Sequence, residues 1–140
     1  ARRFSLDGLR RAVELCAEAD YIVPNETEYE YYTKMREISV GKNIFFDAGI
    51  RRIVVTLGKK GYCSLTPTEI VCEDCVKAPV VDTTAAGDTF CGAFAVRLAE
   101  GAAVSEALRY ANSAAAITVT RRGAQSSIPT RGEVKKKFNL

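Results

Sequence analysis

The chain of 140 residues has the length and composition of one globular domain: 47% of its residues are hydrophobic, 26% are charged, and no long polar or repetitive tract occurs, which excludes a disordered or fibrous protein. Twenty basic and seventeen acidic residues leave a net charge of +3, which is too small and too scattered for a dedicated nucleic-acid binder. The apolar runs are shorter than the roughly 20 residues that a membrane-spanning helix needs, so we expect no membrane segment.

The first elements in chain order alternate between helix and strand. Apolar residues recur at helical spacing from Asp7 to Ala19, a short strand follows at 21–23, and a polar helix begins near Asn25 and runs toward Lys34. A further helical stretch is expected within 39–49. The chain opens without methionine and without the charged and apolar regions of a signal peptide, which favours a truncated beginning.

The clearest strand covers Ile53 to Leu57. Its dense β-branched residues show no polar alternation, which indicates burial on both faces, as in the parallel sheet of an α/β protein. A glycine-bounded turn at 58–61 follows, and then a hairpin-like pair of strands at 62–65 and 69–72. The sequence therefore predicts a strand followed by a meander.

Helices dominate the rest of the chain. Small and apolar residues predict a closely packed helix over 89–99, and an alanine-rich helix over 105–118 has Ser105 as its expected N-cap. A loop over 121–129 and a basic terminal helix complete the chain. We find no internal repeat and no dividing linker, so residues 1–140 are expected to form a single portion of a domain.

The cysteines allow two interpretations, a zinc or redox site and purely structural residues. Five cysteines and no histidine occur, and Cys72 and Cys75 have C-x-x-C spacing, which invites a zinc or redox interpretation. A zinc site needs about four ligands and no second pair exists. Structural cysteines in a reduced, cytoplasmic compartment are therefore favoured.

The strongest chemical signal is the segment from Asp82 to Asp88. Small residues at Ala85, Ala86 and Gly87 would leave backbone N–H groups bare at a helix start, where unpaired amides and the helix dipole stabilise an anion such as phosphate. Asp88 directly after them could accept a proton from a substrate hydroxyl during phosphoryl transfer. The alternative is an ordinary first-turn aspartate in a helix whose small residues serve packing.

Residues 82–88 and the following Thr-Phe-Cys-Gly-Ala-Phe resemble the second signature of the ribokinase-like carbohydrate kinases. The double alanine is more typical of the family's ribose kinases than of its fructose kinases. Three further segments follow the order of that family, so the resemblance covers nearly the whole chain. It implies transfer of the ATP γ-phosphate to a sugar hydroxyl, most typically D-ribose to ribose 5-phosphate, with Asp88 as the catalytic base.

Two of these segments lie in the first half of the chain. Asn25 and Glu28 resemble the family's N-x-x-E element, which organises Mg²⁺ and phosphate through water; oxygen ligands suit that ion. Asn25 could equally be a helix cap. Thr56, Gly58 and Gly61 resemble the T-L-G-x-x-G nucleotide loop, for which a plain tight turn is the alternative.

The third segment, 115–129, resembles the region where the family binds an activating K⁺. The resemblance implies an oxygen cage beside the anion hole, formed by Asp82, the carbonyls of Thr84, Thr118, Arg121 and Gly123, and the hydroxyl of Ser127. Such a cation would rigidify the 82–88 loop and add positive potential there. Asn112 lies where the family places a contact to the adenine edge, although a helix-packing amide fits it equally well.

The resemblance also sets the expected architecture. It implies an α/β protein: the C-terminal, ATP-binding and catalytic half of a doubly wound ribokinase-like fold with a mostly parallel sheet, without the N-terminal sugar-binding half. The implied cofactors are ATP, Mg²⁺ and K⁺. The implied partners are a small-molecule sugar and ATP, with no nucleic acid or membrane, and the parent protein would be a homodimer. The isolated chain is expected to be weakly active or inactive.

Three other functions were weighed. The parent protein could phosphorylate another sugar or a nucleoside on the same scaffold, which only the missing half would decide. The chain could also be a non-catalytic nucleotide-binding fragment. An NAD-binding enzyme is disfavoured because no G-x-G-x-x-G follows any strand.

Overall fold

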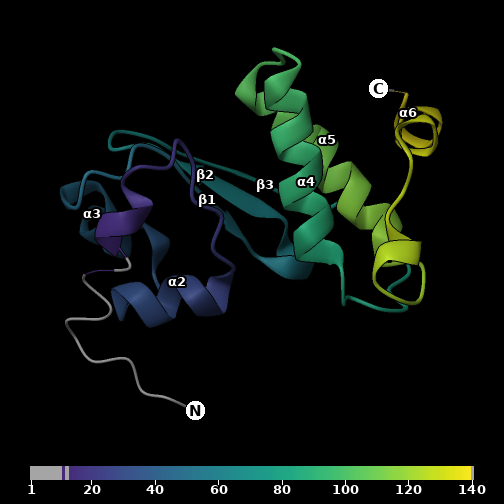
Figure 1. Ribbon diagram of the computed structural model, residues 1–140. Coiled ribbons are helices and arrows are strands. Elements are labelled where there is room, and N and C mark those ends of the chain that lie inside the picture. Colours follow the sequence, from purple (N-terminus) through teal and green to yellow (C-terminus); the bar gives the residue numbers. More distant parts are fainter. Residues whose placement is uncertain (1–10, 12, 140) are drawn as a thin grey trace. The chain divides into compact units, whose positions relative to one another are not determined.

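The computed structural model describes residue 11 and residues 13–139, which divide into two compact units after Glu73 (Figure 1). This division was not predicted from the sequence, and a single catalytic portion over 1–140 stays a prediction. The predicted helix over 7–19 is helical from 13 to 16, and its beginning lies outside the described residues. Within the described part of the chain, no helix has the length and apolarity needed to cross a bilayer.

The helices of the first unit are α2, Glu26–Thr33, and α3, Ile38–Asp47, close to the predicted ranges. Tyr29 of α2 is 1% exposed and its ring lies 5.6 Å from that of Phe45 on α3. Its hydroxyl donates to the carbonyl of Ile38 at 2.7 Å, and burial raises its pKa to about 12. A buried tyrosine with its hydroxyl satisfied therefore fastens α2 to α3.

The sheet of the first unit has three strands in the order β1–β2–β3: Ile53–Thr56, Tyr62–Leu65 and Ile70–Glu73. Both pairings are antiparallel, so the predicted meander is confirmed. Two isolated parallel bridges, Ile22 to Ile53 and Asn25 to Thr56, join the 22–25 segment to the other edge of β1.

The prediction of a mostly parallel sheet is not confirmed by the described residues. The burial on which it rested is real, because Ile53, Val54 and Val55 are all 0% exposed. Burial on both faces does not set strand direction, however. The connection from β1 to β2 is a single short turn, and a turn of that length joins only antiparallel strands.

One apolar cluster connects the helices and the sheet of this unit. Each of its fully buried side chains contributes about 1.5–3 kcal/mol relative to exposure. Residues from the first helix, α2, α3, β1 and β2 all take part. The buried members are Val13, Tyr29, Phe45, Ile50, Ile53, Val55, Cys63 and Leu65.

A disulfide links β2 and β3. Cys63 and Cys72 are directly opposed in the strand register with their Cα atoms 4.0 Å apart, and their sulfur atoms are bonded. The expectation of reduced cysteines is therefore wrong for this pair, and Cys72 is bonded to Cys63 and not to Cys75. Burial raises the pKa of the Cys75 thiol. The described residues contain no group of three or more His, Cys, Asp or Glu placed to hold a metal ion.

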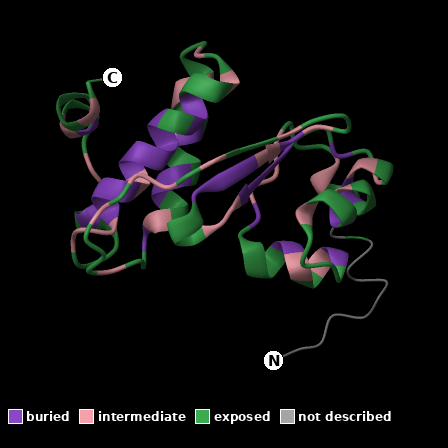
Figure 2. Cartoon of the chain, turned by 180° about the vertical axis from the view of Figure 1, so that it is seen from behind, coloured by how far each residue is buried: buried purple, intermediate pink, exposed green. Residues whose placement is uncertain are grey.

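The second unit is built on α4, Ala86–Ala99, and α5, Val104–Thr118, which pack side by side (Figure 1). Figure 2 shows α5 as mostly buried, while α4 keeps an exposed side. Alanines allow the close approach of the two helices. The expected cap is wrong by two residues, because Ala103 is the N-cap of α5 and Ser105 lies within the helix.

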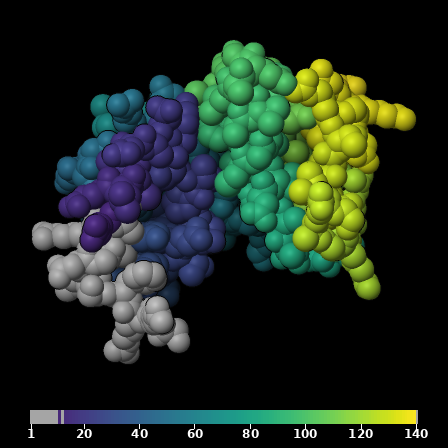
Figure 3. Space-filling view, viewed as in Figure 1, coloured from purple at the N-terminus to yellow at the C-terminus, as the bar shows by residue number. Residues whose placement is uncertain are grey.

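The chain ends in α6, Arg131–Phe138, which packs on α5. Thr130 and Glu133 form a reciprocal capping box at its start. Val134 of α6 is 1% exposed and joins an apolar cluster with Tyr110, Ala114 and Ile117. In Figure 3 the yellow C-terminal residues lie against the green helices of this unit.

Candidate functional site

The loop before α4 is tied to the end of α5. The carbonyl of Val119 accepts from the amides of Val81 at 2.7 Å and Asp82 at 3.2 Å. The Asp82 carboxylate accepts from the Thr84 amide at 3.0 Å, the Thr84 hydroxyl at 2.5 Å and the Gly123 amide at 3.0 Å. The structure therefore brings together three of the residues predicted to surround K⁺.

These contacts hold Asp82 in its ionised form. The Thr84 hydroxyl, the Gly123 amide and the Thr84 amide donate to it, the charge of Arg122 adds to them, and the pKa of Asp82 falls to about 2. Oδ1 accepts both contacts from Thr84, whereas Oδ2 accepts only from the Gly123 amide and keeps a second lone pair. An anionic oxygen with a free lone pair suits a monovalent cation.

The other predicted K⁺ ligands lie at the C-terminal end of α5 and in the loop that follows. Thr118 and Ser127 are both 0% exposed. The Thr118 carbonyl accepts from the Arg121 amide at 3.1 Å, and the Ser127 hydroxyl donates to the Ala124 carbonyl at 2.6 Å. Gly123 has φ +95°, and a Cβ there would lie 2.7 Å from Ser126 Oγ. The oxygen-rich donor set fits a hard cation, and the glycine is required by the turn that forms it.

The predicted anion hole is only partly bare. The Ala86 amide donates to the Thr83 carbonyl at 3.2 Å and Ala85 is 3% exposed, which corrects the expectation that both are open. No described residue accepts from the amides of Gly87 or Asp88. Gly87 is exposed, and a Cβ added there would meet nothing within 4 Å. The open donors are therefore confined to the two residues at 87 and 88.

Asp88 lies in the first turn of α4 and is exposed. Ala85, the N-cap, makes no side-chain hydrogen bond to this turn. The position suits a base that meets a substrate, and it equally suits an acid that interacts with the helix dipole. Geometry alone does not choose between these roles.

Asn112 sits on the buried side of α5, where it is 7% exposed. Its Nδ2 donates to the Asp74 carbonyl at 2.9 Å. This contact is the one expected of a packing amide. The contact to an adenine edge stays a prediction.

In the first unit, Asn25 and Glu28 form a reciprocal capping box. The Asn25 side chain accepts from the Glu28 amide at 2.8 Å, and Glu28 Oε2 accepts from the Asn25 amide at 2.9 Å. The helix-cap role of Asn25 is thereby shown. Both side chains are exposed, and Glu28 keeps its other carboxylate oxygen, so a water-mediated role with Mg²⁺ is compatible with the cap.

The predicted nucleotide loop lies next to that capping box within the same unit. Thr56 forms the parallel bridge with Asn25 and donates to the Pro24 carbonyl at 3.0 Å. Gly58 and Gly61 have φ of +57° and +92°, a region that favours glycine. The tight turn is therefore real, and its glycines are needed for the backbone conformation.

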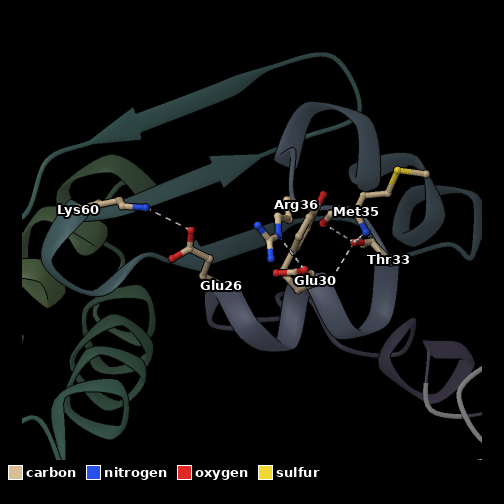
Figure 4. A network of polar contacts seen from close by, with 7 residues as sticks. Glu26, Glu30, Thr33, Met35, Arg36 and Lys60 are labelled. Carbon is tan, nitrogen blue, oxygen red and sulfur yellow. Dashed lines mark hydrogen bonds and ion pairs between the residues drawn. The ribbon is translucent and has the colours of Figure 1, made fainter.

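Sequence reasoning missed the side chain that links these two motifs. Lys60 Nζ lies 3.4 Å from Glu26 Oε1, as Figure 4 shows. The position of Lys60 inside the T-L-G-x-x-G loop is the sequence feature that could have identified it. Sequence reasoning also missed a mostly apolar cavity of about 240 Å³ beside Glu28. The cavity is lined by Val13, Cys16, Ile22, Val23, Pro24, Glu28, Tyr32 and Phe45.

Comparison with known proteins decides the family. The model of the pfkB family carbohydrate kinases matches residues 5–131. The chain belongs to the pfkB family of carbohydrate kinases. The resemblance inferred from the four motifs is thereby confirmed.

Individual pfkB relatives agree. The chain is 46% identical over 127 residues to a ribokinase of Haemophilus influenzae, covering 86% of this chain and 41% of that protein. A ribokinase structure from Thermotoga maritima superposes with TM-score 0.87 at 41% identity, covering 91% of this chain and 45% of that one. An Arabidopsis thaliana ribokinase complexed with ribose and ATP superposes with TM-score 0.86 at 37% identity, covering 91% and 43%. The chain thus spans less than half the length of these relatives.

Proposed function

We propose that the complete protein transfers the γ-phosphate of ATP to a hydroxyl of a sugar, with D-ribose as substrate and ribose 5-phosphate as product. The observation that carries the proposal is the start of α4, where the exposed Asp88 follows an unobstructed Gly87 on a loop held by Asp82. The ribokinase relatives support the choice of ribose.

Asp88 acts as the base in this proposal. It orients the sugar hydroxyl and accepts its proton as the phosphoryl group moves through a largely dissociative transition state. The amides of Gly87 and Asp88 donate to the phosphate oxygens, and the dipole of α4 adds to their effect. No side chain at 87 obstructs the approach.

Residues elsewhere hold the nucleotide and the ions. Thr56, Gly58 and Gly61 form the nucleotide loop, and Asn25 and Glu28 would hold a Mg²⁺ ion through water, which would supply positive charge for the phosphates. The oxygen atoms around Asp82 would hold K⁺. Because Asp82 already joins the loop to Gly123 through hydrogen bonds, the cation site and the anion site share one rigid segment.

The decisive experiment replaces Asp88 with asparagine in the complete encoded protein. Loss of the base lowers kcat by about 10²- to 10⁴-fold, while the Kd for ATP, measured by calorimetry, stays near that of the wild type. The matched control is Glu106→Gln, because Glu106 is the third residue of α5 just as Asp88 is the third residue of α4. Near-normal turnover of Asp88→Asn would remove the proposed base.

Two alternatives are separated by the same assay. ATP binding without any sugar-dependent turnover of the wild type points to a non-catalytic nucleotide-binding protein. Turnover with fructose or a nucleoside but not with ribose points to another substrate. We further propose a cytoplasmic homodimer as the complete protein, which light scattering tests for its oligomeric state.

A further inference from the structure

Two buried threonines join the first turn of α4 to the last turn of α5. The Thr118 hydroxyl donates to Thr89 Oγ1 at 3.0 Å and lies 3.3 Å from the Ala114 carbonyl. Thr89 is 4% exposed and Thr118 is 0% exposed. A hydroxyl contact so deeply buried is shielded from competing water, so it constrains the helices more than an exposed one would.

Val119, the residue after Thr118, contacts the beginning of the loop that leads into α4. Val119 accepts from the amides of Val81 and Asp82, while Thr118 contacts Thr89, the residue directly after Asp88. Thr118, the last residue of α5, and Val119, its C-cap, therefore contact the two ends of the segment 81–89. The position of its amides and of Asp88 follows the end of α5.

The helix α4 also packs along α5, and Thr89 and Phe90 near its start are both buried. Its N-cap makes no side-chain hydrogen bond, and Asp88 lies exposed. Its first helical bond, from the Thr89 amide to the Ala85 carbonyl at 2.9 Å, begins at the same threonine that contacts Thr118. The threonine pair is thus a buried polar contact between α5 and the turn that carries the proposed base.

We propose that the Thr89–Thr118 hydroxyl pair positions Asp88 and the neighbouring amides for phosphoryl transfer. This inference rests on the proposed function and deepens it. Neither threonine side chain touches substrate, so both are positioning residues. If the hydroxyl of Thr118 is removed, Thr89 can turn to a carbonyl of its own helix, and the first turn of α4 loses its register against α5.

The test replaces Thr118 with valine, which keeps the shape and removes the hydroxyl. In the complete encoded protein, kcat falls by about 10- to 100-fold, the cost of displacing a reacting group by about 1 Å. KM for ATP and for the sugar stays close to the wild-type value, because binding contacts remain. Thr118→Ser restores the hydroxyl and most of kcat.

The chain offers a matched control two residues further on. The Thr120 hydroxyl donates to the Ile117 carbonyl at 2.7 Å, a contact within the end of α5. Thr120→Val therefore removes the same chemical group without touching α4. Its kcat stays at the wild-type value, whereas a fall equal to that of Thr118→Val overturns the proposal.

A second readout does not require activity. Hydrogen exchange of the Thr89 amide reports the first turn of α4, and it becomes faster in Thr118→Val and in Thr89→Val but not in Thr120→Val. If the two threonines act as one unit, the double variant exchanges no faster than either single variant. Unchanged exchange in Thr118→Val overturns the positioning role even if the wild type proves inactive.

Failure of this inference is distinguishable from failure of the proposed function. If Asp88→Asn abolishes turnover while Thr118→Val keeps the wild-type kcat, the base is right and the positioning pair is wrong. If Thr118→Val loses activity only in proportion to the fraction unfolded in a thermal melt, the pair is merely structural. If exchange responds as expected but Asp88→Asn is fully active, the anchor is right and the kinase mechanism is wrong.

Discussion

Substitution of Gly87 by alanine separates folding from phosphate binding at one position. Gly87 is the second residue of α4 and has no positive φ. An added Cβ meets nothing within 4 Å. The backbone and the packing of this chain therefore do not require glycine there. Under the proposed function, the glycine allows close approach of a phosphate to the amides.

The substitution is expected to raise the stability of the protein and to lower its activity. Replacing glycine by alanine at a compatible position stabilises a protein by about 0.4–1 kcal/mol, because the unfolded chain loses freedom. The methyl group also occupies the space in front of the amide. Loss of one donor to a developing oxyanion costs about 10²- to 10³-fold in kcat. We expect Gly87→Ala to be more stable than the wild type and far less active.

The assay pairs urea denaturation with sugar-dependent turnover of MgATP. Gly132→Ala is a matched control, because Gly132 is also the second residue of its helix, is exposed, and has open space around its Cβ position. The N-terminus of that helix is closed by the Thr130 capping box, so no anion site is proposed there. Gly132→Ala gains similar stability and keeps full activity.

Three results would refute the reasoning. A Gly87→Ala protein with unchanged kcat shows that no phosphate approaches this amide. A Gly87→Ala protein that is less stable than the wild type shows that the position is not open, so its glycine serves packing. Equal loss of activity in Gly87→Ala and Gly132→Ala assigns the effect to helix starts in general.

Three further predictions concern stability. Asn25→Ala removes a capping contact and lowers the free energy of unfolding in urea by about 1 kcal/mol, while Asn25→Ser recovers it; no change contradicts the capping box. Reducing the Cys63–Cys72 bond, which closes a 9-residue separation, lowers that free energy by about 2–3 kcal/mol; a mass unchanged by reductant would show that no bond exists. Hydrogen bonds from the Arg121 side chain and Thr130 lower the pKa of Glu133 to about 2. The contribution of ionised Glu133 to the free energy of unfolding is therefore complete above pH 4.5 and is lost as the pH falls toward 2. An NMR titration midpoint near 4.5 contradicts this.

Local sequence signals predicted most of the elements. The alanine-rich α5, the small-residue α4 and the buried β1 follow from composition and periodicity, because each is decided by residues close in sequence. The capped start of α2 was likewise available from the Asn25 and Glu28 spacing. The exact first residue of α5 was not, because a helix end depends on contacts outside the helix.

Long-range pairing was the harder problem. Burial of β1 predicted a mostly parallel sheet. The turn bounded by Gly58 and Gly61 makes β2 run antiparallel, whereas the 22–25 segment forms two parallel bridges with β1. The Cys63–Cys72 bond depends on strand register, which the spacing of cysteines does not reveal.

The contacts around Asp82 could not be predicted from residue chemistry alone. The contacts among Asp82, Thr84 and Gly123 join positions up to 41 residues apart, which no local pattern encodes. The hydrogen bond from the Ala86 amide to the Thr83 carbonyl was also missed, although it joins residues close in sequence. The small side chains at 85–87 had been taken to indicate unpaired backbone amides.

An uncapped helix start does not by itself indicate a ligand in this chain. The N-caps of α3 and α5 also make no side-chain hydrogen bond, so the missing cap of α4 is unremarkable alone. What α4 adds is an unobstructed Gly87 and a preceding loop fixed through Asp82 to Gly123. A loop used only for packing would gain nothing from leaving open space at residue 87 while its backbone is held in place. Donors that face open space are what stabilisation of a transferring phosphoryl group requires, and that combination is the reason we propose a catalytic role for this segment.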